Sequence, residues 1–302
     1  GLMKSLLQQS IEVFEKERYP VNMLGGDRLR YGNYGWEHAG CERLLRLGRN
    51  MMRFTEKTAA ATDFRRWGGD QEDARRMFEA YNELPCRSCR TVDEHQLVLQ
   101  RPGVCVWISE LDDEFAYIAL QGTEIVEYAG AVSPFEKLLR FLVSRTDLKV
   151  GLPPVEAESE LDRILLSYAA GYNVRATKMI RVNNLRDVLE AYKPILEERL
   201  QEWEGCRVLQ ISDNGERVMI SRTSSGVAVE NVSAEATPEA RCLTVDRREA
   251  GRLLFGPFPP SYADIRTDIF WRALFPLPFY WGVLGNGRSE EHTSELQSRP
   301  HL

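Results

Sequence analysis

The chain has 302 residues, of which 43% are hydrophobic and 28% are charged, and its net charge is −6. This balance is typical of a soluble globular protein with two or three domains, and it lacks the broad basic surface of a nucleic-acid binder. No apolar run approaches the roughly 20 residues that span a bilayer, and no signal peptide is visible. Six cysteines scattered through a long chain indicate reduced thiols and a cytoplasmic location.

The first predicted module covers residues 1–55 and opens on an amphipathic helix that ends near Arg18. Apolar side chains recur there with helical spacing, while lysine, glutamine and glutamate occupy the other face. A short strand is expected at Val21–Leu24, and a second apolar stretch at 44–54 is expected to form a strand at one edge of a sheet.

Between these strands lies an aromatic and glycine-rich stretch, residues 25–36, on which the rest of the first module depends. It reads Gly-Gly-Asp-Arg-Leu-Arg-Tyr-Gly-Asn-Tyr-Gly-Trp. Glycine has no Cβ, so the first two residues allow a tight turn or a close approach to a ligand. On spacing alone the stretch indicates a turn with core aromatics. His38 follows it and is either a base or, beside Gly40, a surface turn residue.

The second predicted module covers residues 56–178. We expect helices over 70–81, from Ser133 (as N-cap) and Pro134 onward, and over 158–170, with strands at 104–108, 115–120, 124–128 and 149–152. The acidic turn at 111–114 is interpreted as a solvated hairpin tip rather than a cation site. Cys86 and Cys89 form a Cys-x-x-Cys pair without the further ligands that zinc requires, which favours a loop with two thiols.

The third predicted module covers residues 179–287. A strand or connector at 179–182 precedes a helical pair over 185–203 that Pro194 is expected to break or kink. The sequence Asp-Asn-Gly at 213–215 predicts a hairpin between strands at 207–211 and 217–221. Further strands are expected at 227–229 and 242–245, and a capping box at Asp246 predicts a helix that ends before Gly256.

The stretches 25–36, 246–257 and 274–281, in this order, resemble the tandem GNAT acetyltransferases of the enhanced-intracellular-survival type. The resemblance covers nearly all of residues 1–281 and implies an α+β chain. Its parts would be the second half of a GNAT domain, a degenerate second GNAT-like domain, and a sterol-carrier-like α/β domain at the C-terminus. The second module carries no arginine-and-glycine pyrophosphate loop before Ser133, so it is expected to bind no acetyl-CoA.

The resemblance also implies site residues. In this family a loop ending in glycine wraps the pyrophosphate of coenzyme A at a helix N-terminus, which favours anions. By that match Gly1, Leu2, Met3 and Lys4 contact the cofactor, acetyl-CoA, and so do Gly26 and Asp27. Tyr31 matches the tyrosine general acid of the family, while Tyr34 and Trp36 are expected to pack. No metal is implied.

The family's terminal carboxylate acts as general base, but here no residue can take that role. Residues 288–302 resemble the translation of a sequencing adapter, and the chain opens inside a helical pattern. We therefore expect a gene fragment cut at both ends, with 288–302 as an artefact. Phe279, Tyr280 and Trp281 near the natural end either line the site or, in the interpretation we favour, pack.

Taken together, the sequence predicts an N-acetyltransferase fragment that transfers acetyl from acetyl-CoA to a small-molecule amine. We expect no nucleic-acid partner and no membrane partner. The alternative is a non-catalytic module that carries an apolar ligand in the sterol-carrier-like domain. A third hypothesis holds that the family is enzymatic while this chain, lacking half of its catalytic domain, is inactive. A homo-oligomer is compatible with the resemblance, since related proteins tend to form rings.

Overall fold

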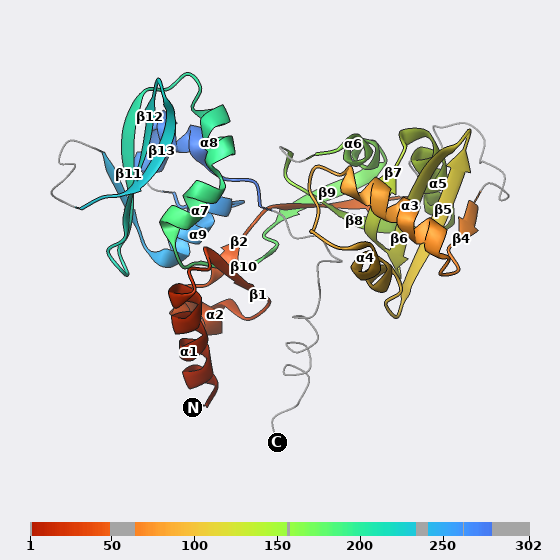
Figure 1. Cartoon of the computed structure of the whole chain (residues 1–302), viewed down its shortest axis with the longest axis horizontal. Coiled ribbons are helices and arrows are strands. Elements are labelled where there is room, and N and C mark those ends of the chain that lie inside the picture. Colours follow the sequence, from red (N-terminus) through yellow and green to blue (C-terminus); the bar gives the residue numbers. More distant parts are fainter. Residues whose placement is uncertain (1, 49–63, 156–157, 234–240, 262, 280–302) are drawn as a thin grey trace. The chain divides into compact units, whose positions relative to one another are not determined.

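The computed structural model describes residues 2–48, 64–155, 158–233, 241–261 and 263–279. The chain divides into two compact units: unit 1 combines residues 1–41 with 176–279, and unit 2 is built on residues 42–175. Both units mix helices with sheets (Figure 1), which confirms the predicted α+β class. The boundaries of the two compact units differ from those of the three predicted modules, because unit 1 contains both the start of the chain and most of the third module.

The first sheet of unit 1 has three antiparallel strands in the order β1-β10-β2, two from the start of the chain and one from residues 178–182. β10 pairs with β1 on one side, where Val21 faces Val182, and with β2 on the other, where His38 faces Met179. The elements concerned are α1 (Leu2–Lys16), β1 (Val21–Leu24), α2 (Arg28–Tyr31), the 3-10 helix η1 (Gly32–Tyr34), β2 (Glu37–Ala39) and β10 (Lys178–Val182). The predicted first helix and first strand are confirmed.

The second sheet of unit 1 has the order β13-β12-β11-β14, with β14 parallel to β11. Its strands are β11 (Gly205–Ile211), β12 (Arg217–Thr223), β13 (Gly226–Asn231) and β14 (Cys242–Val245). The hairpin at 213–215, the break near Pro194 and the capping box at Asp246 are all confirmed. The helices are α7 (Leu185–Ala191), α8 (Lys193–Arg199), α9 (Arg247–Phe255), α10 (Ala263–Thr267) and α11 (Ile269–Leu274).

Unit 2 is built on a seven-stranded sheet with the order β4-β5-β6-β7-β8-β3-β9. Its strands are β3 (Glu42–Leu47), β4 (Phe64–Arg66), β5 (Val104–Leu111), β6 (Glu114–Gln121), β7 (Glu124–Gly130), β8 (Leu148–Leu152) and β9 (Ala169–Arg175). Its helices are α3 (Gln71–Asn82), α4 (Val92–Leu99), α5 (Val132–Arg145) and α6 (Glu160–Ser167). None of the helices in the described ranges is long and apolar enough to cross a membrane.

Both faces of this sheet are covered by helices, as Figure 1 shows. Side chains alternate along a strand, so neighbouring residues of β6 enter different cores. Ile118 packs with the apolar side chains of α5 and α6, whereas Tyr117 packs with those of α3 and α4. The acidic turn between β5 and β6 is a hairpin tip, in which Asp112 and Asp113 adopt left-handed backbone angles.

Three predictions for this unit are wrong. β3 is not an edge strand, because β9 pairs along its outer side. The helix expected over 158–170 ends at Ser167, since Ala169 already pairs with Leu47 of β3. The helix expected to begin at Ser133 begins at Val132 after Ala131, whose backbone N–H donates to Phe115 and fixes the start of the helix.

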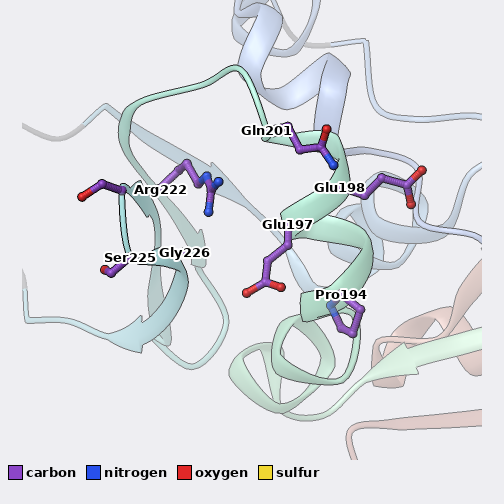
Figure 2. Close-up of a pocket in the computed structure, with 8 residues that line it drawn as sticks. Pro194, Glu197, Glu198, Gln201, Arg222, Ser225 and Gly226 are labelled. Carbon is purple, nitrogen blue, oxygen red and sulfur yellow. The ribbon is translucent and has the colours of Figure 1, made fainter.

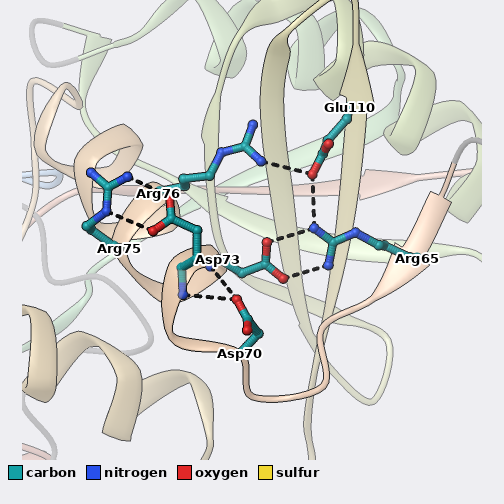
Figure 3. Close-up of polar contacts among 7 residues, drawn as sticks. Arg65, Asp70, Asp73, Arg75, Arg76 and Glu110 are labelled. Carbon is teal, nitrogen blue, oxygen red and sulfur yellow. Dashed lines mark hydrogen bonds and ion pairs between the residues drawn. The ribbon is translucent and has the colours of Figure 1, made fainter.

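A network of charged side chains attaches the short strand β4 to α3 (Figure 3). Arg65 donates to both carboxylate oxygens of Asp73 at 2.6 and 2.7 Å and to Glu110 at 2.9 Å. Arg76 donates to the same oxygen of Glu110 at 3.0 Å. Asp70 caps α3 by accepting from two backbone N–H groups. The network lies on the surface of unit 2 and holds the first strand of the sheet against the helix above it.

Candidate functional site

Tyr31, the predicted general acid, is the last residue of a short helix that follows β1. Asp27 precedes the helix, and its carboxylate accepts a hydrogen bond from the backbone N–H of Leu29 at 2.8 Å. The backbone N–H of Tyr31 donates to the carbonyl of Asp27 at 3.0 Å. The cap satisfies an N–H group that has no partner within the helix. Asp27 therefore fixes the start of the helix on which the phenol is carried.

The ring of Tyr31 lies directly over Gly26. A Cβ added at Gly26 would come within 2.3 Å of Cε2 of Tyr31, so the ring occupies the space that any other residue would need. On another side the ring meets the indole of Trp36 edge to face, with 6.4 Å between centroids. Trp36 is buried. Gly26, which leaves space for the ring, and Trp36 therefore position the half-buried phenol of Tyr31. Trp36 packs in the core, as expected.

Glu37 carries the buried negative charge of this region. The Nη2 atom of Arg28 donates to Glu37 at 2.7 Å, and the Nη2 atom of Arg248 does so at 2.6 Å. Burial alone would raise the pKa of Glu37, but hydrogen bonds from Arg28, from the backbone of His38 and from Arg248 outweigh it and lower the pKa to about 2. Glu37 is therefore ionised and ties α2 to the start of α9.

Two buried arginines, Arg181 and Arg247, contact the turn at Gly35. Arg181 of β10 donates through Nε to the carbonyl of Tyr34 at 2.9 Å and through Nη2 to Glu15 of α1 at 2.7 Å. Gly35 has a left-handed backbone, and a Cβ there would lie 2.7 Å from Cδ of Arg247. Burial and the nearby charge of Arg181 lower the pKa of Arg247. The aromatic turn therefore rests on a packed polar layer and is not an isolated loop.

The remaining predicted cofactor residues lie elsewhere in unit 1. Leu2, Met3 and Lys4 form the exposed first turn of α1, and Gly1 lies outside the described residues. This turn contains no acidic residue, and the first backbone N–H groups of a helix have no partner within it. The predicted contact of this turn with the cofactor stays a prediction. The structure brings Gly26, Asp27 and Tyr31 together, while residues 2–4 stand apart on α1.

The structure also places the other residues that the sequence analysis singled out. His38 is exposed on β2 and belongs to a strand, not to a turn. Cys86 and Cys89 form no disulfide, and no group of three metal-ligating side chains occurs among the residues that the structure describes. Phe279 packs on Phe255 with 5.1 Å between ring centroids. Tyr280 and Trp281 lie outside the described residues.

Sequence reasoning missed the charged residues that hold the site, namely Glu37, Arg181, Arg247 and Arg248. The two consecutive arginines after the capping residue Asp246 were the one local signal for them. Their partners lie far away in sequence: 211 positions separate Glu37 from Arg248. Such a pairing follows from the tertiary fold and leaves no trace in local spacing.

No protein-family model matches the chain, and neither does any curated protein sequence. Solved structures do match, at low identity. A probable N-acyltransferase from Enterococcus faecalis V583 is 14% identical with a TM-score of 0.54, over 82% of this chain and 65% of that one. A GCN5-related N-acetyltransferase from Anabaena variabilis is 12% identical with a TM-score of 0.53, over 89% and 73% of the two chains.

Eis1 from Mycobacterium abscessus is 14% identical with a TM-score of 0.51, over 92% of this chain and 77% of that one. The chain spans only 65% of the Enterococcus structure and equally 65% of a further match, a GCN5-related N-acetyltransferase from Kribbella flavida. At these identities the likeness concerns the fold. The chain therefore shares the fold of the GCN5-related N-acetyltransferases.

Proposed function

We propose that the protein of which this chain is a part is an N-acetyltransferase that moves an acetyl group from acetyl-CoA to the amine of a small molecule. The fold that the chain shares with such enzymes supports this proposal, and so does one observation at the site. The phenol of Tyr31 is held on a capped helix between Gly26 and Trp36, at the position where the resemblance places a general acid. A sterol-carrier-like domain within residues 179–279 belongs to the same proposal.

In this proposal Tyr31 donates the proton that the departing thiolate takes up. A phenol is protonated near neutral pH, so it can serve as a general acid there. Bound acetyl-CoA supplies the activated acetyl thioester. Gly26 and Trp36 keep the ring in place, and the charged layer around Glu37 and Arg181 keeps the turn from moving. The chain's own contribution is thus a positioned proton donor on a rigid support.

The first turn of α1, at Leu2, Met3 and Lys4, would hold the pyrophosphate. Its free N–H groups and the helix dipole favour an anion, and Lys4 adds a positive charge. At 1.5 Å per residue, Lys4 lies about 16 Å along the helix from Glu15. Glu15 in turn contacts Arg181, which holds the carbonyl of Tyr34. This separation suits a cofactor whose long pantetheine arm joins its pyrophosphate to its thiol.

The alternative function, carriage of an apolar ligand, has less support. The helices and the four-stranded sheet of unit 1 enclose a core filled by large side chains. Phe255, Phe270 and Trp271 are each at most 2% exposed. A core packed in this way leaves these positions no room for a ligand, so we place the enzyme first.

The test is an acetyl-transfer assay on the complete protein and on its Tyr31→Phe variant. The variant removes the hydroxyl and keeps the ring that packs on Gly26 and Trp36. We expect turnover to fall by about 10²-fold or more, as for loss of a general acid, with coenzyme A binding nearly unchanged. Unchanged turnover would overturn the role of Tyr31. Loss of coenzyme A binding would instead show a role in cofactor contact.

A further inference from the structure

A pocket of about 490 Å³ lies in unit 1, away from the aromatic turn, between α8 and the turn that joins β12 to β13. We call it the hairpin pocket. Polar residues dominate its lining, among them Glu197, Glu198, Gln201, Arg222, Ser224 and Ser225. Its volume lies within the range of pockets that hold small molecules. A lining of this kind suits a polar ligand better than an apolar one.

Two side chains of opposite charge face each other across this pocket. Glu197 extends from α8 and Arg222 from the hairpin into the gap between them (Figure 2). Both approach Gly226: a Cβ added there would lie 3.5 Å from Oε1 of Glu197 and 3.9 Å from Nη1 of Arg222. The carboxylate and the guanidinium therefore border the same small volume.

The two charges nevertheless do not neutralise each other. No ion pair or hydrogen bond joins Glu197 or Arg222 to another side chain, within the part of the chain that the structure describes. Opposite charges on neighbouring surface elements commonly form such a pair. Here both remain available, one on each wall, for a third molecule that carries both charges itself.

The hairpin wall of the pocket is fixed before any ligand arrives. Gly226 has a φ of +128°, which side-chain-bearing residues rarely adopt. The hydroxyls of Thr223 and Ser225 share a hydrogen bond of 2.7 Å, and the backbone N–H of Ser225 donates to Thr223 at 3.3 Å. A preorganised surface of this kind loses little conformational entropy when a ligand binds to it.

We propose that the hairpin pocket binds a small zwitterion of amino-acid or dipeptide size. Its ammonium group pairs with Glu197 and its carboxylate with Arg222, whose planar guanidinium suits a carboxylate. A ligand with one charge would satisfy one wall and be repelled by the other, so the pocket selects for both charges together. This site is independent of the acetyl transfer proposed above.

The test uses diglycine as the probe, with the full chain and a titration followed by calorimetry or by ligand-observed NMR. N-acetyl-diglycine lacks the cation, and diglycine amide lacks the anion. We expect saturable binding of diglycine at millimolar concentration, and binding at least about tenfold weaker for each analogue, because each loses one charge-assisted contact. Equal binding of all three, or no saturable binding of diglycine, would overturn the proposal.

Variants assign the binding to this pocket. Glu197→Gln and Arg222→Gln should each weaken diglycine binding about tenfold, while Glu230→Gln, which removes an exposed charge of β13 outside the pocket lining, should leave it within about twofold. Exchange of the two charges in the double variant Glu197→Arg/Arg222→Glu should restore binding, since the zwitterion can reverse its orientation. Circular dichroism checks that each variant is folded. Wild-type binding by both single variants would show that the probe binds elsewhere.

Discussion

The guanidinium of Arg248, at the start of α9, donates to the buried carboxylate of Glu37 on β2 at 2.6 and 3.1 Å. Arg28 of α2 donates to the same carboxylate. One buried carboxylate thus joins the helix that carries Tyr31, the strand that follows it, and a helix from the far end of the chain. The position of the predicted acid therefore depends on an ion-pair network as well as on local chain geometry.

Replacing Glu37 by glutamine should destabilise unit 1 strongly. The change leaves Arg28 and Arg248 without the charge that compensates their own, and breaking a buried ion pair costs about 3–5 kcal/mol. We expect about 2–3 kcal/mol because both arginines are partly exposed. Urea unfolding measures the change.

The matched control for this change is Glu12→Gln on the exposed surface of α1, which should alter stability by no more than about 0.5 kcal/mol. The lowered pKa of Glu37 also sets a pH dependence. Its contribution is fully present above pH 4.5 and is lost as the pH falls toward about 2. Equal stability of the Glu37→Gln and Glu12→Gln variants would contradict the bridging role.

Gly26 and Gly25 form a matched pair for a steric test. A Cβ at Gly26 would lie 2.3 Å from the ring of Tyr31, whereas one at Gly25 would meet nothing within 4 Å. Gly26→Ala should therefore displace the ring or the turn and cost about 1–3 kcal/mol, while Gly25→Ala should be nearly neutral. Thermal unfolding gives the stability.

Activity of the complete protein provides the second measurement for this pair. If Tyr31 is the acid, the displaced ring in Gly26→Ala should lower turnover, and Gly25→Ala should retain it. The idea that Gly26 seats the phenol would be abandoned if the two alanine variants behaved alike.

Local patterns in the sequence were enough for the elements that local chemistry specifies. Helical spacing predicted α1, the Asp-Asn-Gly signal predicted the β11–β12 hairpin, and Asp246 predicted the start of α9. The errors arose where tertiary contacts decided. Ala169 and its neighbours extend a helical pattern but pair with β3. α4 was missed although Thr91 and Glu94 form a capping box in its first turn.

The same distinction applies to the site. Tyr31, Gly26 and Asp27 lie within six positions of one another, so a motif can name them. Glu37, Arg181 and Arg247, which stabilise this turn, lie on elements that only the tertiary fold brings together. The sequence therefore predicted a residue for the chemistry, Tyr31, but not the residues that hold it in place.

The two acidic partners of Arg65 in Figure 3 should differ in importance. Asp73 receives two hydrogen bonds from Arg65, and its side chain is 9% exposed, whereas the side chain of Glu110 is 45% exposed. Exposed ion pairs contribute about 0.2–1 kcal/mol and are screened by salt. Asp73→Asn should therefore destabilise unit 2 by about 1–2 kcal/mol and Glu110→Gln by less than about 0.5 kcal/mol. Urea unfolding at low and high salt distinguishes them; a larger effect at Glu110 would refute this ranking.

His95, in the interior of unit 2, should make this unit sensitive to acid. Its ring is fully buried, lies 5.0 Å from that of Tyr81 and touches the guanidinium of Arg90. Burial, together with the charge of Arg90, lowers the pKa of His95 from 6.5 to about 4. The unfolded chain therefore binds a proton between these values that the folded unit does not. Stability must then fall as the pH drops from 6.5 toward 4.

Between about pH 7 and pH 5 this loss amounts to about 2 kcal/mol. Burial raises the pKa of the neighbouring Glu127, which acts in the opposite sense because the folded carboxyl takes up its proton before the unfolded one does. His95→Phe keeps an aromatic ring and removes the titration, so its stability should change much less over this range. Urea unfolding at a series of pH values, with hydrogen exchange of β6 to report on unit 2, makes the comparison, and His38→Gln on exposed β2 should behave as the wild type. If wild type and His95→Phe lost stability in parallel, the acid sensitivity would have to arise from other groups.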